Sequence, residues 1–376
     1  MMDKQRHLNA ICPYFTMFPL NFPLDVLDEY SASLDDGSIV FDPFCGRGTT
    51  NFAARLRGFN SVGVDSSSVA VDIARSKIVN VTAKEIVKIA KRILKKNEDV
   101  ITPTGEFWER AYAPNTLVDI CRIRESLLTS CTTPARIALK ALMLGALHGP
   151  QGINSISYLS NQAPRTYAPK PNYSVRYWKR NNLIAEEVDV LQVIEKRANR
   201  YYGTPLPIGY GVIIKGNSCC PTSYRTVGKW NKNNDKKISL IITSPPYYGL
   251  TTYIQDQWIR NWFSGGPENI EYSNANQICH SNITLFTEQL RCAWIESALL
   301  AENGSILVIR FGAINGRLVS PEHVIRESLF GTEWVINDIR SAGVPPKGRR
   351  QMDSFAGNKE KPNAIEEIDV YAVLRK

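Results

Sequence analysis

Short apolar runs alternate along this chain with stretches of helical periodicity. An apolar run of about four to eight residues bounded by turn residues is typical of a buried strand. Seven such runs cover residues 38–41, 61–64, 210–214, 238–242, 304–310, 334–339 and 368–374. Helical patterns lie between them at 51–57, 286–301 and 321–330. The alternation predicts an α/β fold with a doubly wound sheet of about seven strands, in which the last two runs pair antiparallel at one edge.

The sheet pattern is interrupted by a long insertion. About 200 residues separate Gly48 from Ser244, whereas two βα units of common size need only about 60 to 80. The excess carries helical patterns at 116–130 and 134–147, followed by a stretch rich in Pro, Asn and Tyr. We therefore expect a discontinuous sheet domain and an inserted, mainly helical and loop-rich region. The expected bounds are 1–84 with 206–376 for the sheet domain and 85–205 for the insert.

The first strand run leads into a turn that contains two glycines. Residues 42–50 read Asp-Pro-Phe-Cys-Gly-Arg-Gly-Thr-Thr, and a helical pattern follows. Glycines let the backbone approach a ligand closely, and the start of a helix offers free N–H groups. The second strand run ends in Asp65, where a carboxylate is placed to accept the hydroxyls of a ribose. Together the two features predict a ligand that contains a nucleoside.

A second polar loop follows the apolar run 238–242 and reads Thr-Ser-Pro-Pro-Tyr-Tyr. Two consecutive prolines fix φ and lack N–H groups, so the carbonyls of Ser244 and Pro245 point outward as unpaired acceptors. A planar amine can dock there. Tyr247 offers a ring face on which the base carrying that amine can stack. The loop is typical of a clamp for an exocyclic amino group.

Taken together, these segments resemble the amino-methyltransferases of DNA, which use S-adenosylmethionine. The resemblance rests on the order of residues 42–50, the strand ending in Asp65, and the Ser-Pro-Pro-Tyr motif at 244–247. It implies a Rossmann-like methyltransferase sheet and a glycine loop that holds the methionine part of the cofactor. The cofactor-binding residues that it implies are Asp42, Phe44, Gly46, Gly48, Thr49 and Asp65, the last at the ribose.

Two looser matches add candidates for cofactor contact. Residues 14–19, with Phe18, resemble the family segment that precedes the glycine strand and closes over the cofactor. The alternative is an apolar arm packed on the sheet. Asn217 stands in a Gly-Asn-Ser sequence where the family often has Gly-Asp-Ala near the adenine of the cofactor.

The resemblance also implies a reaction. The catalytic tetrapeptide of the family maps onto Ser244, Pro245, Pro246 and Tyr247, and serine in first place is typical of enzymes that methylate the 4-amino group of cytosine. Adenine enzymes usually carry Asp or Asn there. We expect the target base to leave double-stranded DNA and stack on Tyr247. The alternatives are an adenine-N6 DNA methyltransferase, an RNA base methyltransferase and a DNA-binding protein without turnover.

The distribution of charge predicts nucleic acid as the partner. The net charge is +9, and residues 126–185 contain no Asp or Glu. Within that range, residues 165–180 interleave cations with aromatic rings, a composition that neutralises phosphates and stacks on bases. The alternative is a solvated basic surface whose aromatic residues belong to the core. The candidate DNA-binding residues here are Arg165, Lys170, Arg176, Lys179 and Arg180.

Two further basic segments receive different interpretations. Residues 343–350 combine Pro, Gly and cations, and we expect Lys347, Arg349 and Arg350 to touch a phosphate backbone from an exposed loop. Residues 84–96 instead follow the start of a capping box and carry an apolar stripe at helical spacing, so we interpret their lysines as a solvated helix face.

Cysteine spacing argues against a metal site. The eight cysteines are scattered without a Cys-x-x-Cys spacing, and the four histidines form no ligand spacing with them. We expect free thiols and no metal. Cys45 lies inside the glycine loop, but no histidine is near it in sequence, so a small buried filler is the favoured interpretation.

The overall composition is that of an ordinary globular enzyme, with 43% hydrophobic and 22% charged residues. No stretch reaches the roughly 18 uninterrupted apolar residues that span a bilayer, and residues 1–7 lack a secretory apolar core. We therefore expect a cytoplasmic protein that does not associate with a membrane.

Overall fold

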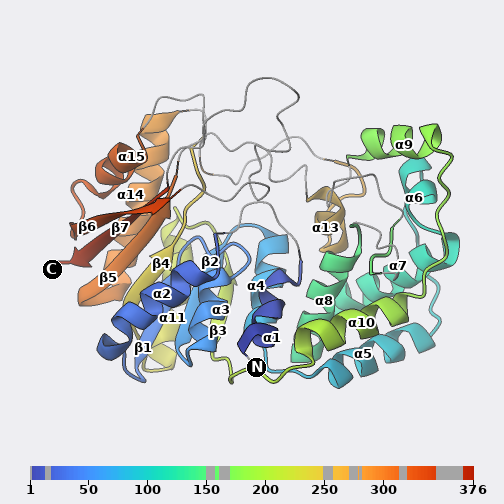
Figure 1. Cartoon of the computed structure of the whole chain (residues 1–376), viewed down its shortest axis with the longest axis horizontal. Coiled ribbons are helices and arrows are strands. Elements are labelled where there is room, and N and C mark those ends of the chain that lie inside the picture. The colour runs from blue at the N-terminus through green and yellow to red at the C-terminus, as the bar shows by residue number, and fades with distance from the viewer. Residues whose placement is uncertain are drawn as a thin grey trace. The chain divides into compact units, whose positions relative to one another are not determined.

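The structure is a computed structural model, and it describes residues 2–12, 18–149, 157–160, 170–248, 257–270, 278, 282–312, 320–343 and 367–376. The chain forms two compact units (Figure 1). The helical unit comprises Met1–Tyr14, Arg75–Leu206 and Thr252–Asn274, and the sheet unit comprises Phe15–Ala74, Pro207–Thr251 and Ala275–Lys376. The predicted domain bounds at 84/85 and 205/206 stay a prediction.

The sheet unit is built on a seven-stranded sheet with the order β3-β2-β1-β4-β5-β7-β6. Its strands are β1 (Ser38–Asp42), β2 (Asn60–Asp65), β3 (Gly211–Lys215), β4 (Lys237–Thr243), β5 (Ala301–Phe311), β6 (Trp334–Gly343) and β7 (Glu367–Leu374). Strands β3, β2, β1, β4 and β5 pair in parallel, whereas β7 pairs antiparallel with both β5 and β6. The predicted doubly wound, Rossmann-like α/β fold is confirmed, and each of the seven predicted runs contains a strand.

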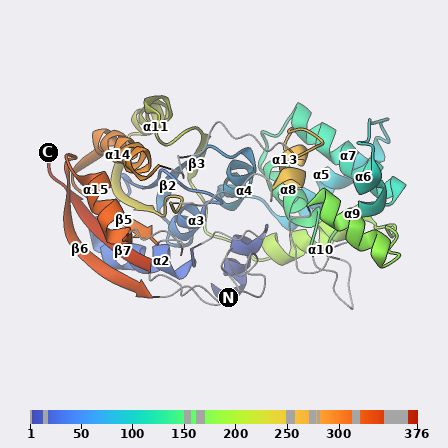
Figure 2. The same cartoon turned by 90° about the horizontal axis from the view of Figure 1, so that it is seen from above.

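Helices cover both faces of this sheet, which explains why its central strands read as unbroken apolar runs. Figure 2 shows α11, α14 and α15 along one face and α2 and α3 along the other. The residues of β1 alternate between two apolar cores: Ile39 and Phe41 pack toward the first group of helices, and Val40 packs toward the second. The helices are α2 (Asn21–Tyr30), α3 (Thr49–Leu56), α11 (Pro221–Asn233), α14 (Ile283–Leu300) and α15 (Pro321–Leu329).

The helical unit contains nearly all the remaining helices of the described residues. They are α1 (Met2–Arg6), α5 (Ala83–Lys95), α6 (Glu106–Ala111), α7 (Pro114–Thr129), α8 (Pro134–Ala146), α9 (Pro171–Arg180), α10 (Val190–Tyr202) and α13 (Trp258–Phe263). Helix α4 (Ser68–Ile78) begins in the sheet unit and ends in the helical unit. The expected capping box of α5 is present, because Thr82 accepts from the Glu85 N–H while the Glu85 carboxylate accepts from the Thr82 N–H.

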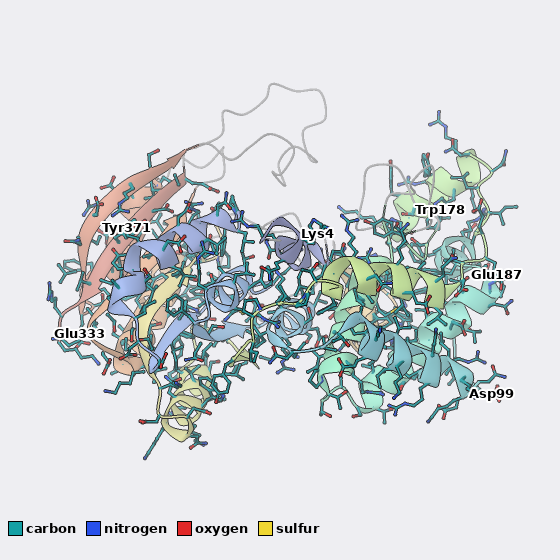
Figure 3. All side chains as sticks on the ribbon, turned by 60° about the horizontal axis from the view of Figure 1, so that its bottom comes forward. Lys4, Asp99, Trp178, Glu187, Glu333 and Tyr371 are labelled. Atoms are coloured by element: carbon teal, nitrogen blue, oxygen red, sulfur yellow. The ribbon has the colours of Figure 1, made fainter. Side chains whose placement is uncertain are left out.

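Helix α9 shows that residues 171–180, part of the stretch rich in Pro, Asn and Tyr, are helical. Pro171 occupies the first turn of the helix, where its missing N–H has no partner to lose. Ser174 and Trp178 are buried at a spacing of one turn. Figure 3 labels Trp178 in the helical unit and, for orientation, Tyr371 on β7 in the sheet unit. The Trp178 ring packs 5.5 Å from that of Phe107. Tertiary packing of one buried face therefore overrides the weak helix propensity of this stretch.

No helix among the described residues is both long enough and apolar enough to cross a membrane.

Candidate active site

The two sequence motifs meet at the centre of the sheet. Strands β1 and β4 are neighbours and run parallel, so the loops that follow them leave from the same edge. The strand order also reverses between β1 and β4, and ligands bind at such a switch point in open α/β sheets. The Thr243 hydroxyl donates to Asp42 Oδ1 at 2.7 Å, which joins side chains 201 positions apart in the sequence.

Asp42 is the most deeply buried acid of this site. Its carboxylate is 0% exposed and accepts from the Thr243 hydroxyl and from the Phe44 N–H at 3.1 Å. Its second oxygen, Oδ2, has no hydrogen-bond partner among the described residues. Burial raises the pKa of Asp42 to about 7, and its hydrogen bonds oppose that rise. A buried acceptor left unpaired is suited to a donor or a positive charge from a bound molecule.

The glycine loop takes a left-handed turn at both of its glycines, with φ of 50° at Gly46 and 70° at Gly48. A Cβ at Gly48 would lie 2.8 Å from the Ala74 Cβ, so this glycine allows the loop to pack against α4. A Cβ at Gly46 would meet nothing within 4 Å. The backbone at Gly46 therefore borders open space, which a ligand can approach closely.

Asp65 shapes the same loop from the end of β2. Its carboxylate oxygens accept from the Gly46 N–H at 3.0 Å and from the Ser67 N–H at 2.8 Å. Burial raises the pKa of Asp65 to about 6, against the effect of these two hydrogen bonds. Each carboxylate oxygen has a second acceptor position, so both can still accept a hydroxyl.

Asn217 lies beside Asp65, because β3 pairs with β2 and the Gly216 N–H donates to the Asp65 carbonyl at 2.9 Å. The Asn217 side chain is exposed, and its Oδ1 accepts from the Cys219 N–H at 2.9 Å. Thus the edge of the sheet brings together the candidate residues that follow β1, β2 and β3.

The remaining cofactor candidates are placed by apolar contacts. Phe44 is half-buried, with its ring edge-on to Trp294 at 6.0 Å, and Thr49 is buried in the first turn of α3. Phe18 is half-buried and lies edge-on to Phe22 at 5.5 Å, packed against the core under α2. The neighbouring residues 14–17 lie outside the described residues.

The diproline motif follows β4 directly. Ser244 is half-buried, Pro245 is buried, and Pro246 and Tyr247 are half-buried. The Tyr247 ring lies edge-on to Phe311 at 5.4 Å. Burial and the nearby Glu367 raise the pKa of Tyr247 well above its ordinary value, while a hydrogen bond with Ser244 lowers it. Tyr247 therefore keeps its proton at physiological pH.

Sequence reasoning missed two partners of the candidate residues. Thr243 was visible as the residue before Ser244, but only the pairing of β1 with β4 reveals its bond to Asp42. Glu367 accepts from the Tyr247 hydroxyl at 2.7 Å across 120 positions, and no local sequence signal points to it.

Cys45 is buried and packs into the space left by Gly63, where a Cβ would lie 2.9 Å from the sulfur.

Four of the candidate DNA-binding residues lie at or on α9 in the helical unit. Lys170 precedes the helix, and Arg176, Lys179 and Arg180 are exposed on it. The Lys179 ammonium forms an ion pair with Glu106 at 2.5 Å, so part of its charge is compensated. The other candidates, Arg165, Lys347, Arg349 and Arg350, lie outside the described residues.

Within the described part of the chain, no group of three or more His, Cys, Asp or Glu residues is arranged to hold a metal ion. The described cysteines are free thiols.

The fold is α/β, and the glycine loop and the diproline motif follow adjacent parallel strands of its sheet. Residues 2–76 match a family described as DNA methylase. The chain is also 29% identical over 106 residues to the Type II methyltransferase M.MjaII of Methanocaldococcus jannaschii, an alignment that covers 28% of this chain and 19% of that protein. The chain thus spans about a fifth of that relative.

Solved structures show weaker similarity. The rRNA methyltransferase aviRa from Streptomyces viridochromogenes aligns over 96% of this chain and 87% of its own, with 11% identity and a TM-score of 0.33. A putative S-adenosylmethionine-dependent methyltransferase from Streptococcus mutans aligns over 68% of this chain and 49% of its own, with 11% identity and a TM-score of 0.21. At scores this low, the fold is defined by the strand order of this chain itself.

Proposed function

We propose that this protein is an S-adenosylmethionine-dependent DNA methyltransferase that methylates the exocyclic 4-amino group of cytosine. One observation carries the proposal: the glycine loop and the Ser-Pro-Pro-Tyr motif follow adjacent parallel strands and are joined by the bond from Thr243 to Asp42. A donor held by the first loop and an amine held by the second would then lie in one crevice. Proximity of this kind is a large part of catalysis for group transfer.

The residues around the glycine loop fit the cofactor. The unpaired Oδ2 of Asp42 is a suitable acceptor for the positively charged methionine part, and the open space at Gly46 admits it. Asp65 keeps acceptor positions for the ribose hydroxyls, with Asn217 and Phe44 nearby for the adenine and the sulfonium region. S-adenosylmethionine supplies a methyl group activated by a positively charged sulfur.

The diproline loop fits the target amine. Ser244 and the Pro245 carbonyl accept its two N–H groups and so direct the nitrogen lone pair toward the donor. Tyr247 is half-buried at this edge of the sheet, and we assign its ring as the stacking surface for a base that has left the duplex. Ser244 is a weak base, and the proton released by the amine passes to water. Positioning and electrostatics therefore account for most of the rate enhancement in this proposal.

The choice of cytosine rests on the residue at the first position of the Ser-Pro-Pro-Tyr motif. A neutral hydroxyl at Ser244 is typical of the cytosine enzymes in the family that the chain resembles, whereas the adenine enzymes usually carry Asp or Asn. The clamp itself would accept the 6-amino group of adenine as well. The product decides between these bases.

Two basic segments support DNA as the substrate. The exposed cations of α9 can neutralise phosphates. The second segment contains Lys347, Arg349 and Arg350 and connects β6 to β7. Lys347, Arg349 and Arg350 lie outside the described residues, and their assignment to the phosphate backbone rests on the sequence. The described residues that flank the segment, Gly343 and Glu367, pair with each other, and Glu367 contacts Tyr247.

The proposal is tested by incubating the protein with unmethylated genomic DNA and labelled S-adenosylmethionine, followed by mass analysis of the nucleosides. We expect 4-methylcytosine in the DNA digest, formed about a hundred-fold more slowly with Ser244→Ala. The appearance of 6-methyladenine alone would overturn the cytosine assignment. A parallel incubation with total RNA separates a DNA enzyme from an RNA enzyme, and the absence of product in both would contradict the proposed function.

A further inference from the structure

A carboxylate that no motif identifies touches the proposed catalytic loop. Glu367 is the first residue of β7, and its Oε1 accepts from the Tyr247 hydroxyl at 2.7 Å. Tyr247 remains protonated because burial, and then the charge and hydrogen bond of Glu367, raise its pKa well above the ordinary value. The bond is thus a hydroxyl donating to a carboxylate, which is stronger than a bond between neutral groups.

The other contacts of the Tyr247 ring fix the plane of the ring rather than the direction of the side chain. Phe311 meets the ring edge-on, with an interplanar angle of 68°. A Cβ at Gly312 would lie 3.1 Å from Tyr247 Cε2 and 3.0 Å from Glu367 Cγ, so a larger residue there would press on both side chains. These contacts set the plane of the ring. The hydroxyl lies on the axis of ring rotation, so its hydrogen bonds, to Glu367 and to Ser244, set the direction of the side chain instead.

Glu367 is itself held within a charged network. Arg310 donates to both oxygens of Asp369, at 2.7 and 2.6 Å, and its guanidinium lies 3.9 Å from the centre of the Phe22 ring. Burial alone would lower the pKa of Arg310, but the hydrogen bonds and charge of Asp369 and the charge of Glu367 raise it. Arg310 therefore pairs directly with Asp369, and its charge also interacts with that of Glu367, the acceptor for Tyr247.

We propose that Glu367 is a positioning residue, which holds the Tyr247 side chain in the direction that presents its ring to the target base. The inference rests on the proposed function, because it assumes that a base stacks on Tyr247. It adds a residue that lies 120 positions from the motif and assigns it a role in DNA binding and turnover, separate from cofactor binding.

The first test is a double-mutant cycle measured as kcat and KM for DNA. We expect Glu367→Ala and Tyr247→Phe each to lower kcat/KM by about ten-fold, the size of one charge-assisted hydrogen bond, and the double variant to be no worse than either. Glu367→Gln should recover most activity, because its Oε1 still accepts. S-adenosylmethionine affinity should stay constant. Glu322→Ala, at an exposed ion pair with Arg326, is the matched control.

Two kinetic outcomes would overturn the inference. The first is a double variant reduced about a hundred-fold, which would mean that the two side chains act independently. The second is a Gln variant as poor as the Ala variant, since that would make the charge of Glu367, rather than its hydrogen bond, the relevant property.

A second measurement does not depend on methyl transfer. Crystal structures of the wild-type protein and of Glu367→Ala should show the Tyr247 side chain displaced or in two conformers in the variant, with the pair of Arg310 and Asp369 intact. An unchanged Tyr247 would overturn the inference whatever the kinetics. If the wild-type protein methylates neither DNA nor RNA, the proposed function fails, while the crystal structures still decide whether Glu367 orients Tyr247.

Discussion

The strand ends of the sheet unit and the outer face of α9 place polar side chains in opposite environments. Asp42 and Asp65 are held by specific hydrogen bonds of 2.7 to 3.1 Å, and burial raises the pKa of both. Arg176 and Arg180 are exposed on α9, where solvent screens their charge. The difference indicates that the sheet edge is built for one ligand geometry, whereas α9 is suited to a charged polymer of any sequence.

The largest effect is expected from Gly48→Ala at the sheet edge. The positive φ costs roughly 1–2 kcal/mol for an L-residue, and the contact of the new Cβ with Ala74 adds about 1–3 kcal/mol. We expect the free energy of unfolding to fall by up to about 5 kcal/mol, with loss of S-adenosylmethionine binding. Chemical denaturation and calorimetric titration measure the two.

Gly58→Ala is the control for that substitution, because Gly58 also has a positive φ of 78° but a Cβ there meets nothing within 4 Å. Gly58→Ala should therefore lose only the stability that the positive φ costs, without the cost of a close contact. Equal losses in the two variants would show that the close contact with Ala74 does not matter.

The second-largest effect is expected on the pH dependence of stability, because the pKa of Asp42 is raised. The folded protein holds a proton that the unfolded chain releases above pH 4, so this part of the stability is present at low pH and lost as the pH rises toward 7. Relative to wild type, Asp42→Asn should gain up to about 4 kcal/mol between pH 4 and pH 8, as measured by denaturation at each pH.

Asp28→Asn is the control with the opposite sign. The hydrogen bond from Arg57 lowers the pKa of Asp28, so its contribution is present at neutral pH and lost in acid. A gain in stability of Asp28→Asn relative to wild type as the pH rises would contradict the lowered pKa of Asp28. The absence of such a gain for Asp42→Asn would contradict the raised pKa of Asp42.

At the catalytic loop, Ser244→Ala should lower kcat by about a hundred-fold, or about 2.7 kcal/mol, because an acceptor for the amine is removed. S-adenosylmethionine affinity should not change. Ser239→Ala within β4, the strand that precedes Ser244, is the matched control, since the described hydrogen bonds of Ser239 lie near the opposite end of β4. If Ser244→Ala weakens cofactor binding as much as it slows transfer, the role given to this hydroxyl is wrong.

The smallest effect is expected on α9. Removing two cations with Arg176→Gln and Arg180→Gln should reduce the salt slope of DNA binding by about 2, as measured by fluorescence anisotropy across salt concentrations. Lys179→Gln should change it less than either arginine, because Glu106 already pairs with Lys179.

Lys84→Gln with Lys88→Gln on α5 serves as the control pair, since we interpret that face as solvated. An equal change from the α5 pair would mean that the cations of α9 have no special part in DNA binding.

Much of the fold could be predicted from the sequence, because the strands are buried on both sides and read as short apolar runs. Helix α9 was not predicted, because its stability depends on burial of Trp178 against Phe107. The beginning of β5 at Ala301, ahead of the predicted residue 304, depends on pairing with Ile238 of β4. Such features arise from tertiary contacts and leave no local pattern.

Some residues of the candidate site could likewise be predicted from the sequence, whereas some of its contacts could not. Gly48 and Asp65 stand in local motifs whose residue types follow from close backbone approach and hydrogen bonding, so a single sequence reveals them. The contacts of Thr243 with Asp42 and of Tyr247 with Glu367 depend on strand order and register. Spacing along the chain carries no information about either pair.

The central pairing of β1 with β4 also bears on how this protein is synthesised. At about 5–20 residues per second, β1 leaves the ribosome roughly 10–40 s before β4 is made. During that time β1 presents an apolar strand edge without its neighbour, and contacts between distant segments form slowly. Helices α2 and α3 are already available to shield one face of β1 during this time, while the strand edge that will pair with β4 stays open.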